Sequence, residues 1–556
     1  MDFCPRRILD LSRAKARGNI VLMDTKVSPL EGPYATLSHC WGQGSHVRLL
    51  KDTREELQKG FRISKLPKVY KEAIEIALRL GVSYLWIDSV CIVQDDKDDW
   101  LQEASSMFDI YSNALFNIGA TGAADGNGCC FVDHDPNLLG PCLFDAASER
   151  PEKPRLRDRL LKWKTRHQHT IPKKPDSTWH VVEESFWADR LYRQPLNQRA
   201  WVLQERLVSP RMIHFGRDQV YWECHQLHAC ETYTKGPQAM YQLQALKGAH
   251  TDVTGDAFKK IYNYKTSLGP ATNRLLPTMD IPANELALVA WSFIVTQYSP
   301  LELTMPGDKL VALSGLAKMM QGLIQDQYVA GLWRSSMIMG LLWRVDHCER
   351  RVEGKDDAHL LRDSLAPTWS WASVHGTVDG MLVPDAKVRE AGADVHIDIE
   401  EIDLNFLGDN EYGALSKAVL HVQGRLWPAA FLAPDMNHHH KLEYGEHYLG
   451  GLNVNFPFIN LGWGPLHSIE CTPNDPVQPR RPEDFGLQAK MHVIPIMSLE
   501  TDGEVYTEGL ILREINNPEG MILYERFGNF EHTAEVGFVD VATRIVDSPT
   551  EVIQMV

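Results

Sequence analysis

The chain has 556 residues, too many for a single hydrophobic core, so roughly two to four domains are expected. Its 57 Lys and Arg stand against 73 Asp and Glu. The net charge of -16 argues against a general nucleic-acid binder, because clustered basic residues hold phosphate backbones. Ten cysteines in so long a chain do not make a disulfide framework, and the first residues do not resemble a secretory signal. The most apolar stretch, 286–295, is about half as long as a bilayer span, so we expect a cytoplasmic protein without a membrane segment.

Residues 34–121 alternate between strand-like and helix-like segments. In chain order the expected elements are a strand over 34–42, a helix over 66–80, a buried strand over 82–93, a helix over 98–114 and a strand over 115–120. Pro67 near the start of the first helix and Gly81 just after it are typical of helix ends. The nearly unbroken apolar run over 82–93 is typical of a strand buried on both faces. This order predicts an α/β layer with a parallel sheet.

The remainder of the chain divides into regions of different character. Residues 151–180 are highly charged and lack periodicity, which indicates an exposed insertion. Strands are expected over 211–224, and helices over 284–298, 309–320 and 328–343. From residue 376 onward, strands are expected over 395–404, 418–426, 492–496, 509–514 and 535–541. We therefore predict an α/β domain at 1–135, a mixed, mainly helical region at 136–375 and a β-rich domain at 376–556.

The helix expected over 98–114 places one carboxylate on its apolar face. At about 100° per residue its large apolar side chains fall on one broad arc, and Glu103 is the only charged residue within that arc. A buried carboxylate is costly unless it is paired, hydrogen-bonded or protonated. Glu103 therefore has either a fixed partner or a chemical role.

Asp88 poses the same question one element earlier, because Ser89 is the only other polar residue in its apolar run. In open parallel sheets, ligands bind beyond the carboxyl ends of the strands. Asp88 lies toward that end of its strand, and Ser38, His39 and Cys40 lie at the same end of the first strand. Polar groups from two strand ends and one helix are thus expected to converge, as they do in α/β active sites.

Each of these residues also has a plain structural explanation. A lone buried carboxylate often satisfies backbone N–H groups or an arginine, and His39 can be a packed or capping histidine. Cys40 and Cys91 can be core residues, because cysteines in apolar segments are most often unreactive thiols of the hydrophobic core. The tryptophans of the segment can likewise belong to the core; they are Trp41, Trp86 and Trp100.

Four blocks occur in order within residues 34–114. They are YATLSHCWG at 34–42, LPKVYKEAI at 66–74, LGVSYLWIDSVCIVQ at 80–94 and DWLQEASSM at 99–107, which runs on to IYSNA at 110–114. Together they resemble the fungal heterokaryon-incompatibility (HET) domain. Further blocks resemble the usual continuation in full-length members of that family: RAWVLQERL at 199–207, IHFG at 213–216, YWEC at 221–224 and PTWSWAS at 367–373. The C-terminal region is similar only in general character.

The resemblance implies a role in incompatibility and regulated cell death in filamentous fungi. HET domains are also remotely similar to TIR domains, which implies a TIR-like or flavodoxin-like parallel sheet. Many TIR domains hydrolyse NAD+ at the nicotinamide–ribose bond with a glutamate in a Trp-x-x-Glu motif, and Trp100-Leu-Gln-Glu103 resembles that motif. NAD+ is then a substrate, and no bound cofactor is expected.

Cleavage of this bond builds positive charge on the ribose, which a carboxylate in an apolar pocket stabilises. The resemblance thus implies catalytic roles for Glu103, which stabilises this charge, and Asp88, which holds a ribose hydroxyl or positions Glu103. The residues expected to contact the substrate are Ser38, His39, Cys40, Trp41, Gly42, Ser89 and Trp100. No metal is expected at this site, and the active form is expected to be a homo-oligomer.

Other interpretations stay open. The domain can be a non-catalytic module that acts by self-association, with a protein partner bound through the middle or C-terminal region. A thiol hydrolase would use Cys40 or Cys91 with His39 and Asp88, although neighbouring strand residues such as His39 and Cys40 point to opposite faces. The segment Cys224-His-Gln-Leu-His-Ala-Cys230 offers zinc ligands in a spacing unlike a standard finger, and His438-His-His440 is expected in a solvated loop.

Overall fold

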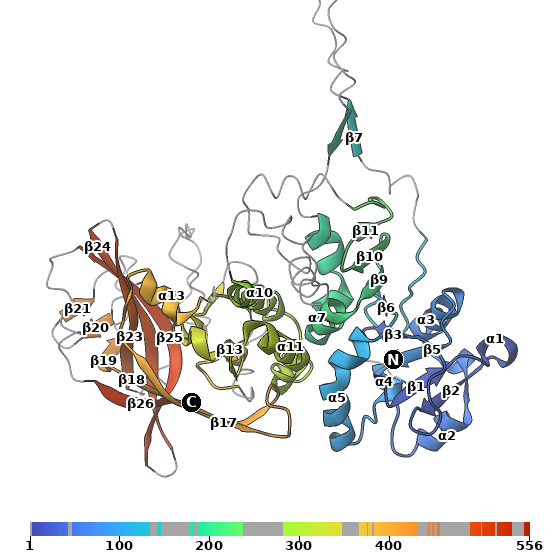
Figure 1. Ribbon diagram of the computed structural model, residues 1–556, viewed down its shortest axis with the longest axis horizontal. Helices are drawn as coiled ribbons and strands as arrows, with labels where there is room; N and C mark the ends of the chain where they lie inside the picture. Colours follow the sequence, from blue (N-terminus) through green and yellow to red (C-terminus); the bar gives the residue numbers. More distant parts are fainter. Residues whose placement is uncertain are drawn as a thin grey trace, which may run out of the picture.

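The chain folds into an α/β part, a helical part and a β-rich part, which follow one another along the long axis of the molecule (Figure 1). This arrangement confirms the predicted fold class. The computed structural model describes residues 3–42, 47–133, 142–145, 178–181, 186–236, 282–346, 366–374, 376–380, 383–431, 442–444, 447–449, 453–455, 490–501, 503–517, 520–535 and 550–556.

The N-terminal sheet has a parallel middle and antiparallel flanks. Its nine described strands lie in the order β11-β10-β9-β6-β3-β5-β1-β2-β4. They are β1 (Arg7–Asp10), β2 (Asn19–Asp24), β3 (Tyr34–Ser38), β4 (Phe61–Arg62), β5 (Tyr84–Ile87), β6 (Phe116–Gly119), β9 (Arg211–Phe215), β10 (Val220–Cys224) and β11 (His228–Cys230). β3 pairs in parallel with β5 and β6, and β6 pairs in parallel with β9. Numbered along the chain, these four strands run 2-1-3-4, which is the flavodoxin-like order.

Helices cover both faces of this sheet. They are α3 (Lys68–Arg79), α5 (Lys97–Ser112) and α7 (Ala200–Val208), which precede β5, β6 and β9. His39 contacts Tyr70 of α3, whereas the preceding residue, Ser38, contacts Glu205 of α7. Because neighbouring residues of a strand point to opposite faces, α3 lies across the sheet from α7. α5 packs against α7 and therefore shares its face.

The strand predicted over 82–93 is wrong in its extent. β5 ends at Ile87, and the next residues form the helical turn α4 (Asp88–Cys91). The apolar run is unbroken because both elements are buried; Val90 and Cys91 are 1% and 0% exposed. Periodicity cannot separate a buried strand from a buried turn in so short a segment. Asp88 consequently lies just beyond the carboxyl end of β5.

The described middle region is mainly helical, as predicted. Its long helices, α10 (Ala283–Tyr298) and α11 (Ser314–Ile324), pack against each other. The helix predicted over 328–343 is wrong in its first half, where β12 (Tyr328–Val329) and β13 (Leu332–Trp333) form a hairpin; α12 (Met337–Leu341) follows. Ala330 and Gly331 have φ values of 48° and 97°, the backbone conformation that a two-residue hairpin turn requires.

The described strands of the C-terminal part form an eleven-stranded sheet that is almost wholly antiparallel. Its longer strands are β17 (Asp398–Phe406), β18 (Leu415–Gly424), β23 (Met491–Thr501), β24 (Glu504–Asn516), β25 (Ile522–Glu535) and β26 (Glu551–Met555). They confirm the strands predicted in 395–514. The predicted strand beyond residue 535, the histidines 438–440 and most of the expected insertion at 151–180 lie outside the described residues.

One hydrophobic core runs through all three parts. Helix α11 packs on α5 and α7, and the Gln204 side chain of α7 accepts the backbone N–H of Leu316 at 3.2 Å. At Gly315 the approach is so close that an added Cβ would overlap the Cβ of Phe108 on α5. The middle region therefore rests directly on the two helices that cover one face of the N-terminal sheet.

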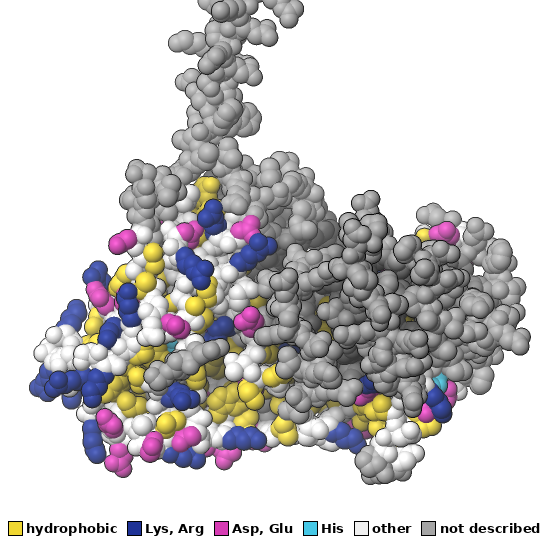
Figure 2. All heavy atoms as spheres, turned by 180° about the vertical axis from the view of Figure 1, so that it is seen from behind, with side chains coloured by type: hydrophobic (Ala, Val, Ile, Leu, Met, Phe, Trp, Pro, Cys, Tyr) yellow, Lys and Arg dark blue, Asp and Glu magenta, His cyan; other side chains and the backbone are white. Residues whose placement is uncertain are grey.

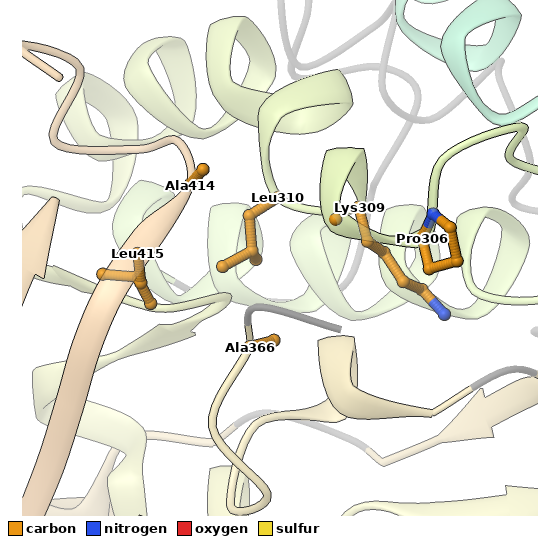
Figure 3. A pocket seen from close by; sticks show the side chains of 7 residues that line it. Pro306, Lys309, Leu310, Ala366, Ala414 and Leu415 are labelled. Carbon is orange, nitrogen blue, oxygen red and sulfur yellow. The ribbon is translucent and has the colours of Figure 1, made fainter. Parts of the chain in front are cut away.

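A small hollow lies between the helical and β-rich parts. It is lined by Pro306, Gly307, Lys309, Leu310, Ala366, Ala414 and Leu415 (Figure 3). The Lys309 side chain runs away from Leu415, and its ammonium group donates to the carbonyl of Ser299 at 3.2 Å. Burial lowers the pKa of Lys309 to about 7. The hollow is therefore lined by apolar groups and backbone, with the lysine charge turned away from it.

The described surface gives two further observations. Acidic, basic and apolar side chains are interspersed over the N-terminal part of the face in Figure 2, so charge of one sign does not dominate there. Among the helices that the structure describes, none has both the length and the apolar character of a membrane span.

Gly315→Val is expected to loosen the contact between the middle region and α5, because the new side chain would overlap Phe108. Overpacking of this kind costs about 1–3 kcal/mol. Lys318→Val is the matched control, since it places the same β-branched side chain on the exposed face of α11. Thermal unfolding of the full chain should give a lower Tm for Gly315→Val than for Lys318→Val. Equal Tm values for the two variants would contradict the close packing.

Candidate functional site

Strands β3, β5 and β6 lie side by side in the N-terminal sheet (Figure 1). Because they are parallel, they end at the same edge of the sheet, and polar residues follow them there. The strand order reverses between β3 and β6, and ligands of such sheets bind in the crevice at this point. The loops that follow these two strands touch each other. Gly42 has a φ of 72°, and an added Cβ there would overlap the Cβ of Asp125 in the loop after β6. The geometry of this edge thus depends on a glycine at position 42.

Asp88 is the centre of the first cluster at this edge. Its carboxylate accepts the indole N–H of Trp41 at 2.9 Å and the backbone N–H of Ser89 at 2.7 Å. The ring Nδ1 of His39 lies 3.7 Å from Asp88 Oδ1. The Asp88 side chain is 22% exposed, whereas that of His39 is 2% exposed. The structure thus brings together four of the residues proposed from the sequence, and Asp88 is the carboxylate among them that reaches solvent.

Tyr70 joins this cluster and was missed in the sequence analysis. Its hydroxyl lies 2.8 Å from His39 Nε2 and 2.7 Å from Ser89 Oγ. Burial, with the nearby negative charge of Asp88, raises the pKa of Tyr70 above its ordinary value. Tyr70 lies on the buried face of α3, where an aromatic residue is normally predicted to belong to the hydrophobic core. The pattern gave no signal for the polar role of its hydroxyl.

Glu103 belongs to a second cluster, built around Arg7 of β1. The Arg7 guanidinium is fully buried and donates to Glu103 Oε1 at 3.1 Å and to both Asp99 oxygens at 2.8 and 2.5 Å. It also donates to the carbonyl of Cys91 at 2.5 Å. Burial raises the pKa of Glu103, and the charge of Arg7 opposes this shift. Of the two possibilities left by its burial, Glu103 has the fixed partner.

The described contacts of Glu103 and of Asp88 lie in separate clusters. Glu103 contacts Arg7 of β1, whereas Asp88 contacts residues that follow β3 and β5. Trp100, also expected at the substrate, packs edge-to-face against Trp201 of α7 with ring centroids 6.2 Å apart. Among the described residues, the hydrogen bond of Glu103 and the ring contact of Trp100 on α5 are not made with a residue of the Asp88 cluster.

Glu205 of α7 is a further buried carboxylate that the sequence analysis missed. It is 5% exposed and accepts a hydrogen bond from the hydroxyl of Ser38, which in turn accepts the Asn117 side-chain N–H at 2.9 Å. Burial raises the pKa of Glu205 to about 7, and hydrogen bonds from Ser38 and Tyr111 oppose this shift. The signal was present, since Glu205 is an acidic residue in the mainly apolar run 200–208.

A fourth buried carboxylate, Glu223, is neutralised. Arg206 Nε donates to it at 2.7 Å, and His214 Nε2 lies 3.1 Å away. The other ring nitrogen of His214 lies 3.0 Å from Thr121 Oγ1, at the end of β6. This network therefore ties the start of the loop after β6 to β9 and β10.

The two thiols near the site lack the features of a nucleophile. Burial raises the pKa of Cys40, and it raises the pKa of Cys91 to about 12. Cys40 packs in an apolar cluster with Leu196, Val202 and Met212. A catalytic thiol needs a thiolate within reach of a base, so these environments argue against a thiol hydrolase at Cys40 or Cys91.

The zinc motif considered in the sequence does not form a ligand cluster among the described residues. Cys224 and Cys230 lie in neighbouring strands as free thiols, and they are not gathered with the histidines between them. The group of potential ligands found in the described part of the chain is instead Glu401, Asp403 and His421, on β17 and β18. Exposed groups of this kind are common without an ion, so this cluster does not by itself indicate a metal centre.

Comparison with known proteins adds one match. Residues 34–205 match the family described as Heterokaryon incompatibility protein (HET). The match begins at the first residue of β3 and ends at Glu205 in α7. No curated protein and no solved structure matches the chain.

Arg7→Met is expected to destabilise the full chain by about 3–5 kcal/mol, because it removes the fully buried cation that Asp99 and Glu103 share and leaves Glu103 without the ion-pair partner described for it. Arg6→Met is the matched control. Arg6 also pairs with Asp99 but is 32% exposed, so its loss should cost less than about 1 kcal/mol. Urea unfolding followed by circular dichroism checks both values. Similar losses for the two variants would show that the buried pairing is not a main source of stability.

Proposed function

We propose that the HET domain at residues 34–205, which implies a role in heterokaryon incompatibility and cell death, acts by hydrolysing NAD+ at the nicotinamide–ribose bond. The observation that supports this proposal is Asp88, a partly exposed carboxylate at the carboxyl end of β5. It is held by Trp41 and Ser89 at the edge where ligands of flavodoxin-like sheets bind. A carboxylate so placed suits a reaction that develops positive charge.

In the proposed reaction water attacks the anomeric carbon of the nicotinamide-bearing ribose. The carbon–nitrogen bond breaks, its electron pair leaves with nicotinamide, and the products are nicotinamide, ADP-ribose and a proton. The ribose carries positive charge in the transition state, which a fixed carboxylate stabilises. Asp88 is the carboxylate proposed to meet the ribose, and His39 and Tyr70 hold its surroundings in place.

The catalytic role of Glu103 stays a prediction, and its pairing with Arg7 bears on it. To act on a substrate, Glu103 would have to leave a fully buried guanidinium, which costs several kcal/mol. In this proposal Glu103 instead holds α5 against β1, and Asp88 faces the substrate. Homo-oligomerisation and a protein partner at the middle or C-terminal region stay predictions as well.

A second candidate function is a non-catalytic module that signals by self-association. The observation that favours it is the same Arg7 pairing, because the glutamate singled out by the TIR-like motif then serves the fold. The packing of α11 on α5 and α7 also brings the middle region into direct contact with the domain. Activity measurements separate the two functions.

Nicotinamide release from NAD+ by the full chain is expected, and Asp88→Asn should reduce it at least about 100-fold, since a transition-state carboxylate contributes at least that much. Asp98→Asn is the matched control, because Asp98 is exposed on the first turn of α5. Glu103→Gln should reduce activity only as far as it reduces the folded fraction, which thermal unfolding measures.

Two outcomes would contradict this assignment. A fully folded Glu103→Gln variant without activity would return the catalytic role to Glu103. Absence of nicotinamide release across a concentration series that includes self-associated protein would favour the non-catalytic module.

A further inference from the structure

The buried glutamates of the N-terminal domain differ in what neutralises them. Three are described as buried: Glu103, Glu205 and Glu223, which are 3%, 5% and 1% exposed. Glu103 pairs with Arg7 and Glu223 pairs with Arg206. Among the described residues, no such ion pair is formed by Glu205. The cost of burying a carboxylate without a cation therefore falls on Glu205.

The surroundings of Glu205 are hydroxyl groups and distant charges. Its carboxylate accepts hydrogen bonds from Ser38 of β3 and Tyr111 of α5. The charged and titratable groups that act on it from neighbouring elements are Asp88, which disfavours its ionised form, and Arg199, which favours it. The Arg199 guanidinium is engaged with the carbonyl of His39. Cys40 is the remaining titratable neighbour, with burial raising its own pKa.

These contacts connect Glu205 to the Asp88 cluster along β3. The Ser38 hydroxyl lies between Glu205 and the Asn117 side chain, and the Ser38 carbonyl accepts the backbone N–H of Ala120 at 3.0 Å. The residues just after Ser38 include those that hold Asp88. A change of charge at Glu205 thus acts on the end of β3, and through it on the candidate site.

We propose that Glu205 is a proton-exchanging positioning residue of the HET domain, which binds and releases a proton between Ser38 and Tyr111 and so sets the end of β3 beside Asp88. As a carboxylate it accepts from both hydroxyls. As an acid it donates one hydrogen bond, so one hydroxyl must rotate. The positioning of Asp88 for catalysis rests on the proposed function, whereas the proton exchange and its effect on β3 do not.

The pH range in which Glu205 exchanges its proton follows from the shift of its pKa. Burial raises the pKa of Glu205 from 4.5 to about 7, so between these values the folded chain holds a proton that the unfolded chain has lost. The stability contributed by this proton is fully present below pH 4.5 and is lost as the pH rises through 7. Between pH 6 and 8 the acid and the carboxylate therefore exchange in the folded protein.

Infrared difference spectra of the full chain between pH 6 and pH 8 test whether Glu205 binds and releases a proton in this range. A carbonyl band of a protonated carboxyl group should be lost at pH 8 in the wild type and should be missing from Glu205→Gln at both pH values. Asp385→Asn is the matched control, because burial also raises the pKa of Asp385, which lies outside the N-terminal domain, to about 7. Its removal should leave the Glu205 band in place. A difference spectrum unchanged by Glu205→Gln would overturn the proposal.

Hydrogen exchange of the peptide that contains Ala120 tests the effect on β3. Relative to Glu205→Gln at each pH, the wild type should lose protection of this peptide on going from pH 6 to 8. Equal protection in both proteins would show that Glu205 does not act on β3, whether or not the chain hydrolyses NAD+. If the chain hydrolyses NAD+, the pH profile of nicotinamide release should show a step near pH 7. Glu205→Gln should abolish this step, and Asp385→Asn should retain it.

Discussion

The guanidinium of Arg7 lies inside the N-terminal domain with no exposed surface, and it binds Asp99, Glu103 and the carbonyl of Cys91. These contacts tie the first strand of the sheet to the start of α5 and to the turn after β5. A buried arginine and its two carboxylates must move together, because separating them leaves charge without a partner. The docking of α11 on α5 depends on this fixed position of α5, and the turn that begins at Asp88 is tied to the same arginine through the Cys91 carbonyl.

Arginine pairing also divides the acidic groups of the domain by role. Glu103 and Glu223 are neutralised by Arg7 and Arg206 and hold elements together. Asp88 keeps contact with solvent and is held by neutral donors, which leaves its charge available to a ligand. Glu205 is buried and forms no ion pair with the described residues; burial raises its pKa to about 7, and the charge of Asp88 adds to this shift. The cost of burying a carboxylate is thus met in three ways within one domain: by pairing with an arginine, by keeping contact with solvent, and by a raised pKa.

Local pattern and strand-end geometry account for the features that the sequence predicted. The parallel strands, the helices between them and the meeting of His39 with Asp88 follow from short-range periodicity and from the rule that parallel strands end at one edge. The partner of Glu103 lies 96 positions away in the chain, in a strand outside the recognised blocks, and the contact of Glu205 with Ser38 spans 167 positions. Such pairings depend on how distant elements pack, which periodicity does not encode. The hairpin before α12 was missed because its apolar residues also suit a helix, although Gly331 marked the turn.

A double-mutant cycle between Arg7→Met and Glu103→Gln, beside a second cycle between Arg7→Met and Glu205→Gln, measures this division of roles most directly. Unfolding free energies of the full-length variants should give a coupling of about 0.5–3 kcal/mol for Arg7 with Glu103, and a coupling near zero for Arg7 with Glu205. This result would show that Glu103 is bound to its arginine in solution while Glu205 is independent of it. A negligible coupling between Arg7 and Glu103 would contradict the account and leave Glu103 free for catalysis.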